Sequence, residues 1–178
     1  GDIASIVDKA NGNFELLSSP AKLEIGPDKS TNWPSWELVW DDALVEPAVV
    51  KDNVKVEIAD NGPAVVSLKV TRKFEGSTFE HGGERVDVAN VVDWFQRKSN
   101  LRAAFPLTVS NPKAVFDLGL GAIESGNTDS FPYYQHCTHQ WADLTAEDGS
   151  YGVSIMNDCK YGMDKPNDNT LRLTLIHT

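Results

Sequence analysis

The feature that most constrains the fold of this 178-residue chain is a series of short runs in which apolar and polar residues alternate. Near the C-terminus, Leu171, Leu173 and Leu175 are separated by polar residues. A period of two is typical of a β-strand that buries one face. The preceding residues 157–162, N-D-C-K-Y-G, are rich in turn-forming types. This part of the chain is therefore predicted to be a turn that leads into a half-buried strand.

The same pattern predicts most of the other elements. Residues 2–17 are expected to form a hairpin, because Asn11-Gly12 tolerates the positive φ angles of a type I′ turn. Further strands are predicted at residues 21–25, 54–58, 65–74, 77–80, 85–94, 101–105, 115–120, 141–144 and 151–155. No segment of ten or more residues has a convincing helical period. We therefore expect a single all-β domain over residues 1–178, folded as a large antiparallel β-sandwich.

The charge balance excludes some classes of partner. The chain has 16 Lys and Arg against 26 Asp and Glu, a formal net charge of −10. Nucleic acids and anionic membranes are bound largely through Lys and Arg, so neither is an expected partner. No apolar run approaches the roughly 20 residues of a membrane-spanning helix. Because the chain begins with Gly1 rather than Met, we expect either a processed protein or, as the favoured alternative, a piece of a longer protein.

Three tryptophans, Trp33, Trp36 and Trp40, fall within eight residues. One interpretation is aromatic packing in the core, since large rings dominate burial energetics. The other is sugar binding, because the apolar face of a pyranose ring lies well on an indole. Trp33 and Trp36 are therefore candidate sugar-binding residues.

Histidine and cysteine cluster at His136, Cys137 and His139, with Cys159 further along the chain. A structural zinc site usually needs four ligands at regular spacing. Alternation places His136 and His139 on opposite sides of a strand, so ordinary hydrogen-bonded histidines are favoured and no metal site is predicted. Both cysteines are expected to be buried thiols, since free cysteine behaves as a small hydrophobe.

Lys160, Tyr161 and Arg172 are the remaining candidates for chemistry. A Lys–Tyr pair can transfer protons. A tight turn, in which Tyr161 packs and Gly162 supplies a permissive backbone angle, is the favoured alternative. Arg172 is expected on the strand face opposite Leu171, turned toward a neighbouring domain or held in a structural ion pair.

Several segments, taken in order, resemble the β-domain of the glycoside hydrolase family 38 α-mannosidases. They are G-D-I-A-S-I-V-D-K at residues 1–9, D-K at 28–29, N-W-P-S-W-E at 32–37, E-R-V-D at 84–87, V-D-W at 92–94, A-F-P at 104–106, H-Q-W-A-D-L at 139–144, N-D-C-K-Y-G at 157–162 and L-R-L-T-L at 171–175. The resemblance covers nearly the whole chain. It departs from the family pattern at Pro34 and Glu37, where the family usually has Asp, and residues 80–84 form a shorter connection than expected.

The resemblance implies a parent enzyme that cleaves terminal α-mannose from glycans with retention of configuration. In that family a separate N-terminal barrel carries a zinc ion, an Asp nucleophile and an acid/base carboxylate, and none of its motifs occurs here. The β-domain packs against the barrel and lines the substrate cleft, and its fold is a supersandwich similar to that of galactose mutarotase. We therefore expect no catalytic residue, metal or cofactor in this chain, with zinc in the barrel. The expected partners are the barrel and mannose-containing glycans, and Arg172 is expected to approach the mannose site.

Retaining hydrolysis requires two carboxylates about 5 Å apart. None of the 26 acidic residues has a sequence context that singles it out, so the chain alone is predicted to be inactive. Two other functions stay open. One is a free-standing carbohydrate-binding module that uses Trp33 or Trp36. The other is a sugar mutarotase, which needs a convergent His and Glu pair, but the four histidines His81, His136, His139 and His177 show no such motif.

Overall fold

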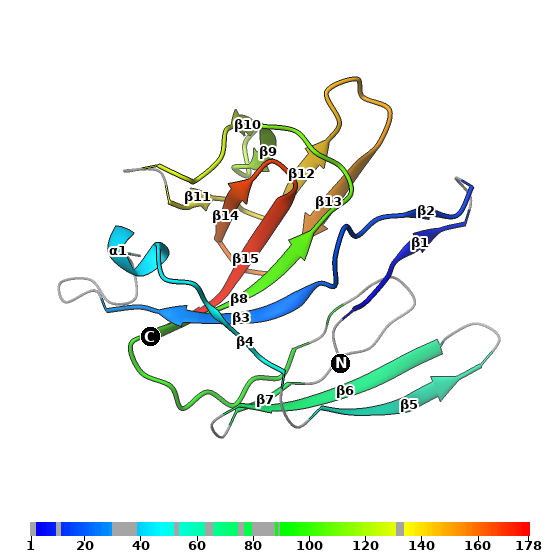
Figure 1. Cartoon of the computed structure of the whole chain (residues 1–178), viewed down its shortest axis with the longest axis vertical. Coiled ribbons are helices and arrows are strands. Elements are labelled where there is room, and N and C mark those ends of the chain that lie inside the picture. The colour runs from blue at the N-terminus through cyan, green and yellow to red at the C-terminus, as the bar shows by residue number, and fades with distance from the viewer. Residues whose placement is uncertain are drawn as a thin grey trace. The chain divides into compact units, whose positions relative to one another are not determined.

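A computed structural model of the chain describes residues 3–9, 12–29, 39–51, 54–62, 66–74, 77–79, 88, 90–130 and 134–178 (Figure 1). The chain divides into two compact units. The larger contains Asp2–Ala48 and Lys98–Thr178, and the smaller contains Gly1 and Val49–Arg97. Among the described residues, no helix is long and apolar enough to cross a membrane.

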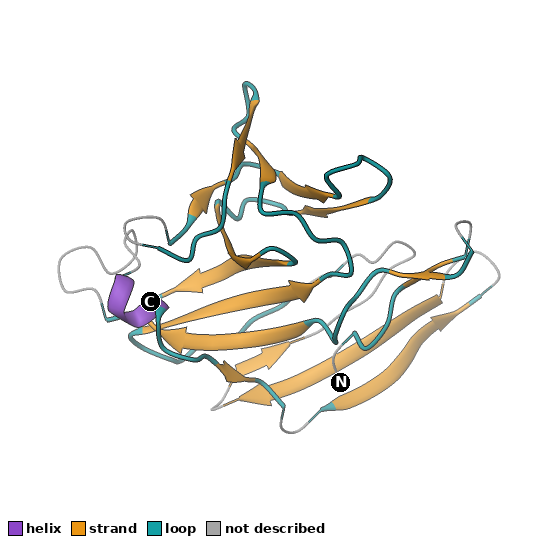
Figure 2. Ribbon diagram, turned by 45° about the horizontal axis from the view of Figure 1, so that its top comes forward, coloured by secondary structure: helices purple, strands orange, loops and turns teal. Residues whose placement is uncertain are grey.

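A six-stranded sheet dominates the larger unit, and its pairings from β11 to β3 are antiparallel (Figure 2). Its strand order is β11-β14-β15-β8-β3-β4. The bounds are His136–Cys137 for β11, Gly162–Asn167 for β14, Thr170–His177 for β15, Ser99–Pro106 for β8, Lys22–Pro27 for β3 and Ala48–Val49 for β4. The predicted strands at residues 21–25, 101–105 and 171–175 are thereby confirmed, and β8 ends at Pro106, which has no N–H to continue the ladder.

A second, four-stranded antiparallel sheet has the order β10-β9-β12-β13. Its bounds are Ala122–Ser125 for β10, Ala114–Asp117 for β9, Trp141–Thr145 for β12 and Gly152–Met156 for β13. The N-terminal hairpin is also confirmed: β1 (Val7–Asp8) pairs with β2 (Phe14–Glu15). The short helix α1 (Trp40–Ala43) begins at the last of the clustered tryptophans.

The apolar core draws on both sheets of the larger unit. Phe116 and Leu144 come from the four-stranded sheet, and Met163, Leu171 and Leu173 from the six-stranded sheet. All of them belong to one buried cluster. Two sheets that share one core form a sandwich, because each sheet buries one apolar face against the other. The all-β sandwich prediction is confirmed for this unit.

The smaller unit contains a three-stranded antiparallel sheet, β5-β6-β7. The bounds are Lys55–Asn61 for β5, Val66–Phe74 for β6 and Ser77–Phe79 for β7. These strands were predicted from alternation, yet Val56 and Ile58 are 53% and 66% exposed.

Two strand predictions need correction. Residue 88 and residues 90–96 have no strand conformation, so the predicted strand at 85–94 is wrong over its described part. Asn90 there is exposed, and its amide donates to the carbonyl of Val88. The strand predicted at 115–120 ends at Asp117, because the Asp117 carboxylate accepts from the Gly119 N–H and Gly119 takes a positive φ, which together form a turn.

Candidate functional site

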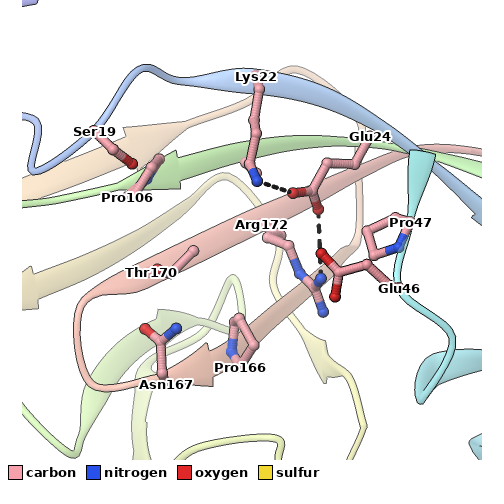
Figure 3. A pocket seen from close by; sticks show the side chains of 11 residues that line it. Ser19, Lys22, Glu24, Glu46, Pro47, Pro106, Pro166, Asn167, Thr170 and Arg172 are labelled. Carbon is pink, nitrogen blue, oxygen red and sulfur yellow. Dashed lines mark hydrogen bonds and ion pairs between the residues drawn. The ribbon is translucent and has the colours of Figure 1, made fainter. Parts of the chain in front are cut away.

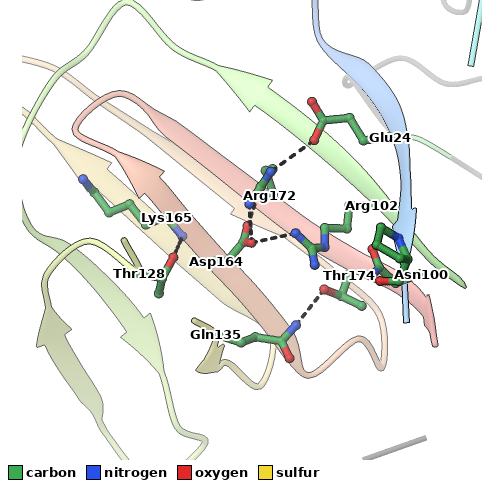
Figure 4. A network of polar contacts seen from close by, with 10 residues as sticks. Glu24, Asn100, Arg102, Thr128, Gln135, Asp164, Lys165, Arg172 and Thr174 are labelled. Atoms are coloured by element: carbon green, nitrogen blue, oxygen red, sulfur yellow. Dashed lines mark hydrogen bonds and ion pairs between the residues drawn. The ribbon is translucent and has the colours of Figure 1, made fainter. Parts of the chain in front are cut away.

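Arg172 lies on β15 directly opposite Asp164 of β14 (Figure 4). Its Nε donates to Asp164 Oδ1 at 2.8 Å, and its Nη2 donates to Asp164 Oδ2 at 2.7 Å. Two parallel bonds between a guanidinium and a carboxylate are the strongest geometry available to such a pair. The pair therefore fixes the Arg172 side chain against the sheet.

Three further residues extend this pair into a network across β14, β15, β8 and β3. Arg102 Nη1 donates to Asp164 Oδ2 at 3.0 Å. Arg172 Nη1 lies 3.4 Å from Glu24 Oε2, and Lys22 Nζ lies 3.0 Å from the other oxygen of the same carboxylate. Arg102, Asp164 and Glu24 are buried, so the charges are compensated mainly by one another rather than by water.

The environment shifts the pKa values of the two arginines in opposite directions. Burial lowers the pKa of Arg102, and the neighbouring charge of Arg172 adds to this, against the opposing effect of Asp164. Burial also acts to lower the pKa of Arg172, but the hydrogen bonds and charges of Asp164 and Glu24 outweigh it and raise the value. Arg172 is thus the better compensated cation.

A pocket of about 230 Å³ opens beside Arg172 (Figure 3). Its lining is formed by Ser19, Lys22, Glu24, Glu46, Pro47, Ala104, Pro106, Pro166, Asn167, Thr170 and Arg172. The hollow lies where the β14–β15 register shifts between Asp164 and Asn167. Such irregularities often adjoin functional sites, because they re-aim side chains that a regular ladder would hold in its plane.

Of the predicted sugar contacts, only Arg172 lies in the described part of the chain. Its side chain is 14% exposed and forms ion pairs with Asp164 and Glu24. Arg172 also forms part of the pocket lining. Trp33 and Trp36 lie outside the described residues.

The N-D-C-K-Y-G segment is a turn, as predicted, but its special backbone angle falls elsewhere. Cys159, not Gly162, has the positive φ, of 60°. Gly162 lies close to the Gln135 amide, and a Cβ at this position would require that side chain to move. The Lys160 N–H donates to Asn157 Oδ1, and Tyr161 stacks on His139 with ring centroids 5.9 Å apart.

The expectation of buried thiols is wrong: Cys137 and Cys159 are both exposed and free. Cys137 lies on the edge strand β11, and Cys159 lies at the exposed tip of the turn. An edge strand and the tip of a turn both leave a side chain open to solvent, whatever the apolar character of the thiol.

The histidines of the H-C-T-H run contact different parts of the unit. The His136 ring lies 4.4 Å from the Phe116 ring, and its Nε2 is 3.0 Å from the Gly126 carbonyl oxygen. His139 Nδ1 lies 3.8 Å from Asp117 Oδ2. Within the described ranges, no three His, Cys, Asp or Glu residues are grouped so that they could hold a metal ion. A zinc ion therefore does not fit this part of the chain.

Sequence reasoning missed two partners that the fold supplies. Asp164 was not singled out, although Asp168 and Asn169 between β14 and β15 indicate a hairpin that places residues 164 and 172 opposite each other. Asp28 was also missed as a partner, and its fully buried carboxylate lies 2.6 Å from His177 Nδ1. These two residues are far apart in sequence, so no local pattern indicates their contact.

Comparison with protein families and curated proteins gives a consistent result. The family model described as "Glycosyl hydrolases family 38 C-terminal domain" matches residues 1–178. An α-mannosidase of Saccharomyces cerevisiae is 26% identical over all of this chain and 18% of its own length. An α-mannosidase G of Dictyostelium discoideum is also 26% identical, over 91% of this chain and 16% of its own. The chain thus spans less than a fifth of the length of these relatives.

Solved structures share the fold. A glycosyl hydrolase family 38 protein from Enterococcus faecalis superposes with a TM-score of 0.76 and 13% identity, over 97% of this chain and 24% of its own. An α-mannosidase from Enterococcus faecalis V583 gives a TM-score of 0.73 and 14% identity, over 97% of this chain and 23% of its own. At these identities the likeness supports the antiparallel all-β fold and no more.

Proposed function

The chain belongs to the glycosyl hydrolase family 38 C-terminal domain family, and from that premise we propose that it is the non-catalytic β-sandwich domain of a longer α-mannosidase. The observation that carries the proposal is the match of the family model over residues 1–178. The curated relatives named α-mannosidase extend far beyond the matched part, which leaves room for a catalytic domain in the same polypeptide.

In this proposal the catalytic carboxylates and the zinc ion belong to an N-terminal barrel of the parent protein. The described residues offer no group of ligands for a metal. Two of their buried carboxylates are also committed: Asp164 to two arginines, and Glu24 to Lys22 and Arg172. The 178-residue chain is accordingly proposed to be inactive alone.

An exposed apolar surface of the larger unit is a candidate docking surface for the barrel. It comprises Leu118, Leu120 and Tyr161. His139 contacts both the turn at Gly119 and the Tyr161 ring. Leu120 is fully exposed and Tyr161 is 56% exposed. Exposed apolar surface is typical of domain interfaces that lack their partner.

Arg172, Trp33 and Trp36 are proposed to contact the substrate once the barrel is present. For Arg172, the proposal is supported by its position on the edge of the pocket beside β15. Mannose-containing glycans are the proposed substrates, as the names of the relatives suggest.

The test compares the parent protein with the isolated chain. The complete coding sequence should yield a protein that hydrolyses p-nitrophenyl α-D-mannopyranoside, and a metal chelator should abolish that activity. The 178-residue chain should show none. A full-length protein without α-mannosidase activity, or an active isolated chain, would refute the proposal.

A further inference from the structure

We infer that the pocket beside Arg172 is a binding site for one neutral sugar ring, formed by this chain without the help of another domain. The inference deepens the proposed function and rests on it for the kind of sugar, an α-mannoside. The shape, charge and chemistry of the pocket supply the rest of the argument.

The apolar walls come from three prolines and an alanine. Pro106 ends β8 opposite Thr170, and Pro166 lies within the irregular part of β14. Proline lacks an N–H, so these positions interrupt the ladders and leave rigid C–H surfaces facing the hollow. Pro47 and Ala104 complete the apolar lining. Small-molecule sites typically combine such walls with a few fixed polar groups.

The polar groups suit hydroxyls better than ions. Two cations, Lys22 and Arg172, face two carboxylates, Glu24 and Glu46, so the lining has no formal net charge. Each sugar hydroxyl both donates and accepts, and can therefore bridge a cationic donor and a carboxylate. An ionic ligand would lack a surplus of opposite charge.

One carboxylate is built into the site. Glu24 is 4% exposed, and its Oε2 receives only a long contact of 3.4 Å from Arg172. That oxygen retains acceptor capacity on the pocket side of β3. A buried acceptor held by Lys22 and Arg172 is pre-organised, which reduces the ordering cost of binding.

The volume limits the ligand to a small molecule. About 230 Å³ lies below the roughly 300–1,000 Å³ of pockets that hold drug-sized ligands. A single ring fits such a volume, whereas an extended oligosaccharide would have to leave through the open side. The pocket is therefore suited to the terminal residue of a glycan.

The experiment titrates methyl α-D-mannopyranoside into the 178-residue chain and follows amide chemical shifts by NMR. We expect saturable binding in the millimolar range. Lys22→Met keeps the aliphatic stem but removes a charged donor, and should weaken binding roughly tenfold. Lys113→Met is the matched control, because Lys113 forms an exposed ion pair with Glu124 away from the pocket, and its dissociation constant should equal that of the wild type.

A second variant does not disturb the ion pairs. Ser19 is exposed on the rim, so Ser19→Trp should fill the hollow and abolish binding while the spectrum stays that of a folded protein. Absence of saturable binding to the wild type would overturn the inference. So would binding that survives Ser19→Trp and Lys22→Met but is lost in Trp36→Ala, because the sugar would then lie elsewhere.

Failure of the inference and failure of the proposed function give different results. If the full-length protein cleaves α-mannosides but this chain binds no mannoside, the pocket assignment alone is wrong. If this chain binds the mannoside through Lys22 but the full-length protein has no α-mannosidase activity, the pocket assignment stands and the parent activity is wrong.

Discussion

The two faces of the six-stranded sheet are buried to a similar extent but by opposite means. On the face toward the core, Leu171 is fully buried among apolar side chains. On the other face, Asp164 is only 2% exposed, yet it is surrounded by Arg102 and Arg172. One face removes apolar surface from water, whereas the other compensates its buried charges with one another.

The difference shows that burial alone does not identify a hydrophobic core. A buried ion network contributes little net stability, because desolvation of the ions offsets their attraction. Replacing a single member of the network still lowers the free energy of unfolding strongly, since it leaves a buried charge without its partner. The two faces should therefore respond differently to substitution.

The largest effect is expected for Asp164→Asn. The side chain keeps its shape but loses the charge that compensates both arginines. Breaking a buried pair in this way typically costs about 3–5 kcal/mol in the free energy of unfolding. Chemical denaturation of the two proteins at neutral pH measures the difference.

The matched control is Asp41→Asn, at an exposed position of α1. It should change the free energy of unfolding by no more than about 0.5 kcal/mol. Equal effects of the two substitutions would mean that the outer face does not depend on its charges.

On the inner face, Leu171→Ala should destabilise the protein by about 2–5 kcal/mol, through lost burial and the cavity that remains. Leu120→Ala makes the same chemical change at a fully exposed site and should have an effect within about 0.5 kcal/mol. Thermal denaturation of both variants tests the comparison. A Leu171→Ala protein as stable as wild type would show that the core is not closed around β15.

A smaller effect is expected for Arg172→Lys. Lysine keeps the charge but cannot form the two parallel bonds that Nε and Nη2 make with Asp164. The loss should be about 1–2 kcal/mol, near that of one charge-assisted hydrogen bond. If Lys replaced Arg at no cost in urea denaturation, the bidentate geometry would be irrelevant to the outer face.

Local alternation was enough to predict most strands of the larger unit, because each reports its own buried face. It identified the strands that became β8, β12, β13 and β15. It failed at residues 90–94, where Val92 and Trp94 were assigned to one face of a strand but no ladder forms. Alternation shows that a segment is able to form a strand. Whether it does so depends on a partner strand, which the local sequence does not identify.

Less of the candidate site than of the fold could be predicted from the sequence. Arg172 was identified from its position on the strand, but the residues that give it a role come from three other strands. Asp164 could have been found from the β14–β15 hairpin, and Glu24 could not, since β3 and β15 meet only through β8. The pocket depends on the register shift before Asn167, which proline at 166 alone does not specify.

Lys165 is the most sensitive test of how this sheet compensates a buried charge. It is fully buried beside Asp164, but its ammonium donates to Asn127 Oδ1 and the Asn167 carbonyl rather than to a carboxylate. Burial lowers the pKa of Lys165, and Asp168 and Asp129 only partly oppose this. The unfolded chain therefore binds more protons between the lowered pKa and the usual value near 10.4, so stability should rise with pH in that window.

The measurement is the free energy of unfolding of the wild type minus that of Lys165→Met, from about pH 8 to about pH 10. Subtraction removes the titration of all other groups, which the two proteins share. The difference should move in favour of the wild type as pH rises, because a neutral amine keeps its hydrogen bonds without the cost of a buried charge. A difference that does not change with pH would mean that the charge of Lys165 is as well compensated as that of Arg172. The contrast between a buried cation paired with a carboxylate and one bound only by neutral groups would then not hold.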